Sequence, residues 1–176
     1  MNTDRRRLLL AALAGCAGTI ALVACGSQDP AALTPAEIDS AAACDLDGML
    51  LSDYPGPKAQ LYYQGDARPH WCCDTVEMFN TVLKPEQARP IRAVLVQDMA
   101  LADWEHPRGH WFDARTGWYV LGSKRQGSMG PTLASFRQET DARVFMTRYG
   151  GKLLRYAEVT PGMVDLSGGA LHDGRM

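Results

Sequence analysis

The stretch Thr75-Val-Glu-Met-Phe-Asn-Thr-Val-Leu83 carries the clearest helical pattern in the sequence. Its apolar residues recur every three or four positions, Thr75 is placed to cap the first turn, and Pro85 stops the pattern. Segments with alternating or β-branched residues surround this predicted helix, two before it and one after it. They are Ala59–Gln64, His70–Cys73 and Ile91–Val96. The first half of the chain is therefore predicted to fold in the order β-β-α-β.

The second half of the chain repeats this order. Two predicted strands precede a predicted helix, which is closed by Gly150-Gly151, and a last strand follows. These four segments are Gly117–Gly122, Thr132–Phe136, Asp141–Tyr149 and Lys152–Val159. A chain of 176 residues is long enough for one ordinary domain. We therefore predict an α+β fold, a single domain of two similar β-β-α-β units.

The segment between the two halves, Asp98–Arg115, is rich in Trp, His, Pro and Gly. Long connections of this kind are often functional. Its aromatic residues Trp104, Trp111 and Phe112 could equally be buried to close the domain.

The N-terminus is predicted to be an export signal rather than part of the fold. Three arginines at positions 5–7 precede an apolar stretch that ends in Leu22-Val-Ala-Cys25, which resembles a bacterial lipobox. The arginines fit a twin-arginine signal and a general secretory signal equally well. A second lipobox match ends at Cys16, but cleavage there would leave too short an apolar core. We predict a signal peptide over 1–24, lipidation of Cys25, a flexible tether over 25–42, the domain over 43–165 and a polar tail over 166–176.

The charge of the chain argues against nucleic-acid binding. Removing residues 1–24 changes the formal net charge from −2 to −4, because three arginines and Asp4 are lost. A mildly acidic protein has no electrostatic footprint for phosphate backbones. The sequence also contains no nucleophile-elbow, phosphate-loop or His-Glu-x-x-His motif, so it favours neither a hydrolase nor a nucleotide-binding protein.

The segment Cys44-Asp-Leu-Asp-Gly-Met49 places a thiol and a thioether on one glycine-containing turn. Soft sulfur ligands select Cu(I) over the divalent ions that carboxylates prefer. A buried cysteine and a core methionine would explain the same two residues equally well. Met129 lies in a glycine-rich loop, Gln126–Pro131, which offers little room to bury a side chain, so we interpret it as a further ligand.

Two adjacent cysteines, Cys72 and Cys73, lie at the end of a predicted strand. Neighbouring strand residues point to opposite faces, so at most one of these thiols can join a given site. We expect one to face the core and the other to face solvent, while a disulfide between them would be strained. Because Cys73 lies next to the helix start, its pKa could be lowered by the helix N-terminus.

Four long motifs of this sequence strongly resemble the NosL family of nitrous oxide reductase accessory proteins. The resemblance covers about residues 44–160. The motifs are Cys44–Met49 with Leu51-Ser-Asp-Tyr-Pro-Gly-Pro-Lys-Ala-Gln60, Val96-Gln-Asp-Met99 running into Asp103-Trp104 and His106-Pro107, and Gly122-Ser-Lys-Arg-Gln-Gly-Ser-Met-Gly-Pro-Thr-Leu-Ala-Ser-Phe136.

This resemblance implies a periplasmic copper lipoprotein that is anchored to the outer membrane. Such a protein would bind one Cu(I) and pass it toward maturation of the copper centres of nitrous oxide reductase. The implied partner is the periplasmic copper-accepting subunit of an ABC-type complex. The implied fold is two β-β-α-β units related to organomercurial lyase, which agrees with the repeat in the sequence.

The resemblance also implies which residues bind the metal. Many family members carry Cys-x-x-Cys-Gly-Met at the first motif, whereas this chain has Asp47 at the second cysteine, so we expect no two-thiolate site at that turn. His106 and His110 are four residues apart, a weak signal because Pro107 and Gly109 argue against a helix between them. We expect the ligands beyond the first motif to come from the second half of the chain. The candidates for Cu(I) are Cys44, Met49, Met129, His110 as a nitrogen ligand, and Cys73, which matches a cysteine found before the first helix in part of the family.

Two alternatives to a non-enzymatic copper carrier remain. One is a thiol-dependent enzyme of organomercurial-lyase type, in which Cys73 attacks a carbon–metal bond and Asp74 handles the proton. The other is a lipoprotein that docks onto the same assembly machinery and uses its sulfurs only for packing.

Overall fold

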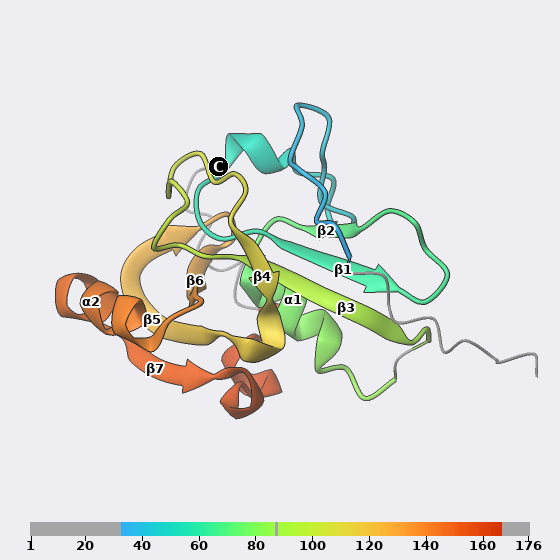
Figure 1. Cartoon of the computed structure of the whole chain (residues 1–176). Helices are drawn as coiled ribbons and strands as arrows, with labels where there is room; N and C mark the ends of the chain where they lie inside the picture. The colour runs from blue at the N-terminus through green and yellow to red at the C-terminus, as the bar shows by residue number, and fades with distance from the viewer. Residues whose placement is uncertain (1–32, 87, 167–176) are drawn as a thin grey trace, which may run out of the picture. The chain divides into compact units, whose positions relative to one another are not determined.

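Two antiparallel sheets, each with its own helix, make up the computed structural model, which describes residues 33–86 and 88–166 (Figure 1). The first sheet has the strand order β2-β1-β3-β4, and α1 connects β2 to β3. These elements are β1 (Ala59–Tyr63), β2 (His70–Cys72), α1 (Thr75–Val82), β3 (Ile91–Gln97) and β4 (Trp111–Asp113).

The second sheet repeats the arrangement of the first. Its order is β6-β5-β7, and α2 connects β6 to β7. These elements are β5 (Trp118–Gly127), β6 (Gly130–Phe136), α2 (Glu139–Tyr149) and β7 (Lys152–Arg155). In both sheets the first strand is central and pairs antiparallel with the second and third strands. The predicted α+β fold of two β-β-α-β units is confirmed, with β4 as an addition at the edge of the first sheet.

Four short 3-10 helices complete the regular structure of the described residues. They are η1 (Leu51–Asp53), η2 (Ala114–Thr116), η3 (Tyr156–Glu158) and η4 (Pro161–Met163). None of the helices within 33–86 and 88–166 has the length and apolar character needed to cross a membrane.

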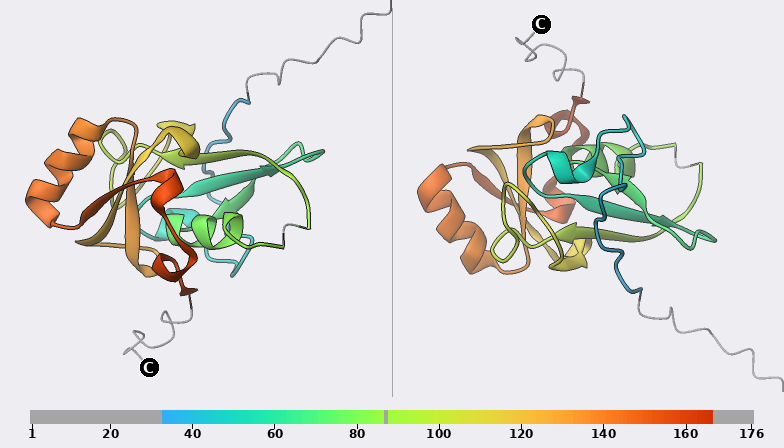
Figure 2. Two further views of the ribbon diagram at one scale, coloured as in Figure 1. Left: turned by 90° about the horizontal axis from the view of Figure 1, so that it is seen from below. Right: turned by 90° about the horizontal axis from the view of Figure 1, so that it is seen from above.

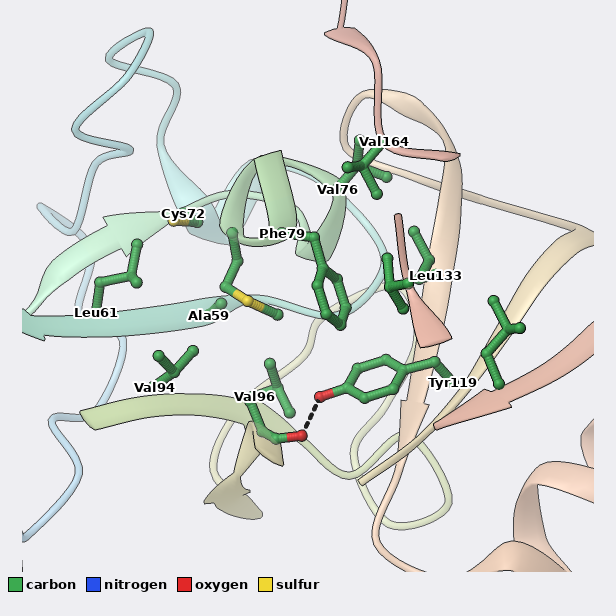
Figure 3. Close-up of a cluster of buried hydrophobic side chains, with 14 of the residues drawn as sticks. Ala59, Leu61, Cys72, Val76, Phe79, Val94, Val96, Tyr119, Leu133 and Val164 are labelled. Carbon is green, nitrogen blue, oxygen red and sulfur yellow. Dashed lines mark hydrogen bonds between the residues drawn. The ribbon is translucent and has the colours of Figure 1, made fainter. Parts of the chain in front are cut away.

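The main hydrophobic core lies between the two sheets and includes α1. Alternate residues of β1 and β3 face Phe79 of α1, and Tyr119 and Leu133 reach the same core from the second sheet (Figure 3). The Tyr119 hydroxyl donates a 2.6 Å hydrogen bond to the Ala114 carbonyl, which satisfies its one buried polar group. The opposite face of the second sheet packs on α2 around Phe136 and Phe145. Figure 2 shows α2 on the far side of this sheet from the first unit.

The N-terminal ends of both helices differ from the prediction: α1 has another capping residue, and α2 begins earlier. Asp74, not Thr75, caps α1, and its carboxylate accepts a 2.9 Å hydrogen bond from Val76 N. The Thr75 hydroxyl instead donates to the Leu133 carbonyl at 2.7 Å and so connects α1 to β6. Helix α2 begins at Glu139, two residues before the predicted start.

The strand predictions of the second half also need correction. The last strand is shorter than predicted, because the chain turns into η3 after Arg155. Strand β5 runs on to Gly127 and β6 begins at Gly130, so the predicted loop around Met129 is a tight hairpin turn.

The connection Asp98–Arg115 closes the domain with its aromatic residues. Trp104, Trp111 and Phe112 are all buried, and the Trp104 indole donates to the Gln126 carbonyl at 3.0 Å. This confirms the packing interpretation of these residues. Strand β4 was not predicted, because it has only three residues and lies in a segment rich in Gly and Pro.

Part of the predicted tether packs against the first sheet. The Gln60 side-chain amide donates to the Ala36 carbonyl at 2.8 Å, and Ile38 is buried. The packed part of the chain therefore extends N-terminal to Ala43, as the segment that crosses the sheet in Figure 2 shows. The predicted signal peptide, Cys16, Cys25 and the tail beyond residue 166 lie outside the described residues.

Candidate metal centre

The turn that carries Cys44 is fixed by its own backbone. Cys44 N donates to the Met49 carbonyl and Gly48 N donates to the Cys44 carbonyl, each at 2.9 Å. Gly48 has a φ of 78°, a left-handed conformation that glycine adopts at no steric cost. Asp45 N donates to the Trp71 carbonyl of β2 at 3.0 Å. The turn is therefore held against β2, near the start of α1.

The structure brings Cys73 and Glu77 to this turn. Cys73 lies between β2 and α1, and its backbone N–H donates to Glu77 Oε2 at 2.9 Å. The Cys44 thiol donates to the same oxygen at 3.2 Å. One ligand atom each from Cys44, Asp47, Cys73 and Glu77 lies within 4.8 Å of all the others. Asp47 is exposed while the other three side chains are buried, so the cluster lies just beneath the surface.

The two thiols of this cluster differ in how readily each loses its proton. The pKa of Cys44 is lowered, first because the Cys73 thiol donates a hydrogen bond to its thiolate. The same hydrogen bond, together with burial and the Glu77 charge, raises the pKa of Cys73. The predicted lowering of the Cys73 pKa by the helix N-terminus is therefore wrong, because Cys73 acts as donor to a neighbouring thiolate. Cys44 is the thiol that loses its proton first.

Burial has the opposite consequence for the neighbouring Cys72. This side chain lies in the main core, and loss of water raises its pKa well above the ordinary value. As predicted, only one of the two adjacent thiols joins the cluster. The prediction that one of the two thiols faces solvent is wrong, since Cys72 and Cys73 are both buried. All three cysteines of the described residues are free thiols, which excludes the considered disulfide between Cys72 and Cys73.

The predicted thioether ligands lie on the turns that border the cluster. Met49 ends the Cys44 turn and is half-buried. Met129, also half-buried, lies in the β5–β6 turn directly after Ser128, whose hydroxyl donates to the Cys73 carbonyl at 2.6 Å. The second half of the chain therefore reaches the cluster through this turn. Whether either thioether binds a metal stays a prediction.

His110 makes its hydrogen bond outside the cluster of potential ligands. It is exposed, has a φ of 57°, and its carbonyl accepts a hydrogen bond from Asp98 N at 2.9 Å. The cluster of potential ligands does not include it. Its role as a nitrogen ligand stays a prediction.

Glu77 is the cluster member that the sequence analysis missed. It stands three residues after the helix cap Asp74, the spacing at which a Glu side chain reaches back to the N-terminus of a helix. This spacing was the available signal, but the wrong choice of Thr75 as cap concealed it. Within the described chain, Glu77 Oε1 is buried without a hydrogen-bond partner, and burial raises the pKa of this carboxyl.

The donor set of this cluster fits a soft cation. Two thiols in contact can both lose their protons when a metal replaces them, and thiolates bind such ions most strongly. The structure places a second thiol from the first half of the chain, Cys73, beside Cys44, while the expectation that the further ligands come from the second half stays a prediction. Asp47 does not prevent a two-thiolate site.

Comparisons with known proteins agree on one family. The NosL family profile matches residues 35–164 of this chain. The copper-binding lipoprotein NosL of Stutzerimonas stutzeri is 33% identical over 156 residues, which cover 87% of this chain and 81% of that protein. The copper-binding lipoprotein NosL of Achromobacter cycloclastes is 32% identical over 169 residues, covering 93% and 84%.

A solved structure supports the same relationship. The crystal structure of the copper chaperone NosL from Shewanella denitrificans superimposes with a TM-score of 0.70 at 39% identity, covering 74% of this chain and 98% of that one. The predicted relation to organomercurial lyase stays a prediction. Matching sequence over most of the chain, together with a matching fold, shows that this protein belongs to the NosL family.

Proposed function

We propose that this protein binds one Cu(I) at the Cys44–Cys73 cluster and carries it to an accepting protein in the periplasm. The observation that carries the proposal is the close approach of two buried thiols, Cys44 and Cys73, whose sulfur atoms lie within 4.8 Å of each other. Paired thiolates with a nearby thioether match the ligand preference of Cu(I). The copper-binding relatives of the family support the choice of metal.

The proposed ligand set is Cys44 and Cys73 as thiolates, with Met129 or Met49 as the third sulfur. Asp47 and Glu77 are hard oxygen donors, which Cu(I) disfavours, so they shape the charge of the site rather than bind the ion. A site with few ligands just beneath the surface favours exchange with a partner over permanent storage. This supports a carrier rather than an enzyme.

The proposal extends to cell location and partner. Lipidation of Cys25 would tether the domain to a membrane, with the outer membrane as the proposed one, and the lipoprotein names of the relatives support an anchor. Mass spectrometry of the mature N-terminal peptide distinguishes Cys25 from Cys16. The proposed partner is the periplasmic copper-accepting subunit of an ABC-type complex, which leads to maturation of nitrous oxide reductase. Family membership is the support for this part.

The enzyme alternative finds less support. Asp74, the residue expected to handle the proton in such an enzyme, caps α1 and accepts hydrogen bonds from Val76 N and from the Thr132 hydroxyl at 2.9 and 2.7 Å. It is not part of the thiol cluster. Incubation with an organomercurial, followed by analysis for released hydrocarbon, separates the two functions, and hydrocarbon release at many turnovers would favour the enzyme.

Competition titration with a chromophoric Cu(I) chelator under anaerobic conditions tests the proposal. We expect one Cu(I) per chain, and a loss of at least about a hundredfold in affinity for Cys44→Ser and for Cys73→Ser, since each removes a thiolate. Cys72→Ala is the matched control, because Cys72 is a neighbouring buried thiol that lies in the core. Equal affinity in the wild type and in the double variant Cys44→Ala/Met129→Ala would overturn the assignment and favour a docking lipoprotein.

A further inference from the structure

Lys58 is a fully buried lysine that is not one of the proposed copper ligands. Its ammonium donates hydrogen bonds to the Pro55 carbonyl at 2.8 Å and to Ser128 Oγ at 2.7 Å. Among residues 33–86 and 88–166 it is the one basic side chain that is buried. Burying an ammonium is costly unless nearby negative charge compensates for the lost water. Its position therefore needs a physical reason.

The hydrogen bonds of Lys58 connect the two halves of the metal centre. The Ser128 hydroxyl accepts a hydrogen bond from Lys58 and donates one to the Cys73 carbonyl at 2.6 Å. Ser128 directly precedes Met129 in the β5–β6 turn. The backbone of Lys58 is itself fixed, because its N–H donates to Gln97 Oε1 at 3.1 Å. Lys58 is thus linked through Ser128, the residue before Met129, to the backbone of Cys73.

The charges around Lys58 are negative. Burial lowers the pKa of Lys58 to about 8, and the charges of Asp74, Cys73, Glu77 and Cys44, in that order, act against this lowering. The lysine is therefore within electrostatic reach of both cysteines of the cluster and of both buried carboxyls beside it. No other cation of the described chain shares this buried position.

Copper binding would increase the negative charge in this region. Two thiolates and one Cu(I) together carry a net charge of −1, and a thioether adds none. In a poorly solvated site such a charge is unfavourable unless a positive group lies near it. The Lys58 ammonium is placed to supply that charge.

We propose that Lys58 is a positioning residue of the copper site, which holds the Ser128–Met129 turn against Cys73 and offsets the charge of the copper-bound thiolates. This inference rests on the proposed copper site. It assigns a role to Lys58 and Ser128, two residues that are not copper ligands in the proposed site.

Three variants separate the charge from the hydrogen bonds. Lys58→Met removes both while keeping similar length, Lys58→Gln removes the charge but keeps a donor for Ser128, and Ser128→Ala removes the link to Cys73 while keeping the lysine. Lys124→Met makes the same change at an exposed lysine of β5 and is the matched control. Circular dichroism and thermal unfolding show which variants fold, and Lys58→Gln carries the test if Lys58→Met does not.

Anaerobic Cu(I) competition titrations from pH 6 to 9, with X-ray absorption of the loaded proteins, give the readout. We expect Lys58→Met and Lys58→Gln to weaken Cu(I) binding about tenfold at pH 7, equivalent to one pKa unit in the thiols. Their affinity should also fall more steeply toward low pH, because thiolates without the counter-charge hold their protons more tightly. Ser128→Ala should reduce the sulfur coordination number while keeping the wild-type pH profile.

The outcomes distinguish this inference from the proposed function. If the wild-type protein loads no Cu(I), the proposed function fails and this inference fails with it. If the wild type loads Cu(I) and the Lys58 variants match its affinity, pH profile and sulfur coordination, the role of Lys58 alone is overturned. A charge effect equal to that of Lys124→Met would overturn it as well.

Discussion

Single side chains of one residue type have different chemistry in this protein because their surroundings differ. Cys72 and Cys73 are adjacent in sequence, yet one fills the main core while the other contacts Cys44. The Cys73 thiol stabilises the Cys44 thiolate, so the pair can lose a proton more readily than an isolated buried thiol. This asymmetry suits a site where a metal replaces thiol protons.

Asp74 shows how burial sets a pH dependence of stability. Burial is the largest effect on this carboxyl and raises its pKa from the ordinary 3.8 to about 6. A raised pKa means that the folded apo-protein holds this proton more tightly than the unfolded chain. The resulting stability is complete below pH 3.8 and is lost as the pH rises through 6.

We predict that Asp74→Asn gains about 2 kcal/mol in unfolding free energy relative to the wild type between pH 4 and pH 7, because the amide cannot ionise. Asparagine keeps an oxygen that can cap α1. Urea unfolding of the apo-protein at several pH values measures this difference. Asp113→Asn, at an exposed cap of η2, is the control. A difference that is constant with pH, or that falls as pH rises, would contradict the account.

The β5–β6 hairpin contacts the first unit through glycine. A Cβ added to Gly127 would lie 2.2 Å from Asp74 Oδ2 and 2.8 Å from the Thr132 Cβ. Asp74 is fully buried and fixed as the cap of α1, so it has little freedom to move. This close approach places the Ser128–Met129 turn beside Cys73.

Gly127→Ala is expected to destabilise the protein by about 1–3 kcal/mol, the usual cost of overpacking. It should also weaken Cu(I) binding, because the Met129 turn must move away from Cys73. Gly162→Ala is the control, since a Cβ there meets no atom within 4 Å. Denaturant unfolding and Cu(I) titration of both variants measure the two effects. Gly127→Ala with unchanged stability would mean that the hairpin can shift freely.

Local sequence patterns predicted the elements well and the contacts between them poorly. Alternation in β1 and helical spacing in α1 come from burial of one face, which is visible in sequence. The hydrogen bond from Cys44 to Glu77 joins residues 33 positions apart, and that from Lys58 to Ser128 joins residues 70 apart. No local pattern encodes such pairs. The second thiol could be named from family resemblance, but its contact with Cys44 required the fold.

Both β-β-α-β units supply residues that border the candidate metal centre. The first unit provides the cysteines, and the second contributes the Met129 turn. Hydrogen bonds join the units nearby, including one from the Thr75 hydroxyl to the Leu133 carbonyl and one from the Ser135 hydroxyl to the Gln97 carbonyl, at 2.7 and 2.6 Å. Pairing of the units therefore fixes the geometry of the site.

The surface around Cys44 has the composition of a docking face. Among the described residues, three of the five exposed large hydrophobic side chains lie on this one segment, namely Leu46, Leu50 and Tyr54. Residues 44–57 contain three aspartates and no lysine or arginine. We propose that the copper-accepting subunit binds here, and charge complementarity requires it to present an apolar patch with a basic rim.

Replacing both Leu46 and Leu50 with serine should slow Cu(I) transfer to the purified accepting subunit by about tenfold or more, because contact area is lost. The affinity for Cu(I) itself should not change, since neither side chain is a ligand. Leu101→Ser, on the connection between the units and 64% exposed, is the control. Stopped-flow transfer kinetics measure the effect. Transfer at the wild-type rate would exclude this face as the contact.

X-ray absorption of the protein loaded anaerobically with one equivalent of Cu(I) tests the central claim most directly. The account predicts Cu(I) bound by two or three sulfur atoms, with one sulfur fewer in Cys73→Ser and an unchanged spectrum in Cys72→Ala. Coordination by nitrogen or oxygen atoms alone in the wild-type protein, or a spectrum that Cys73→Ser leaves unchanged, would contradict it.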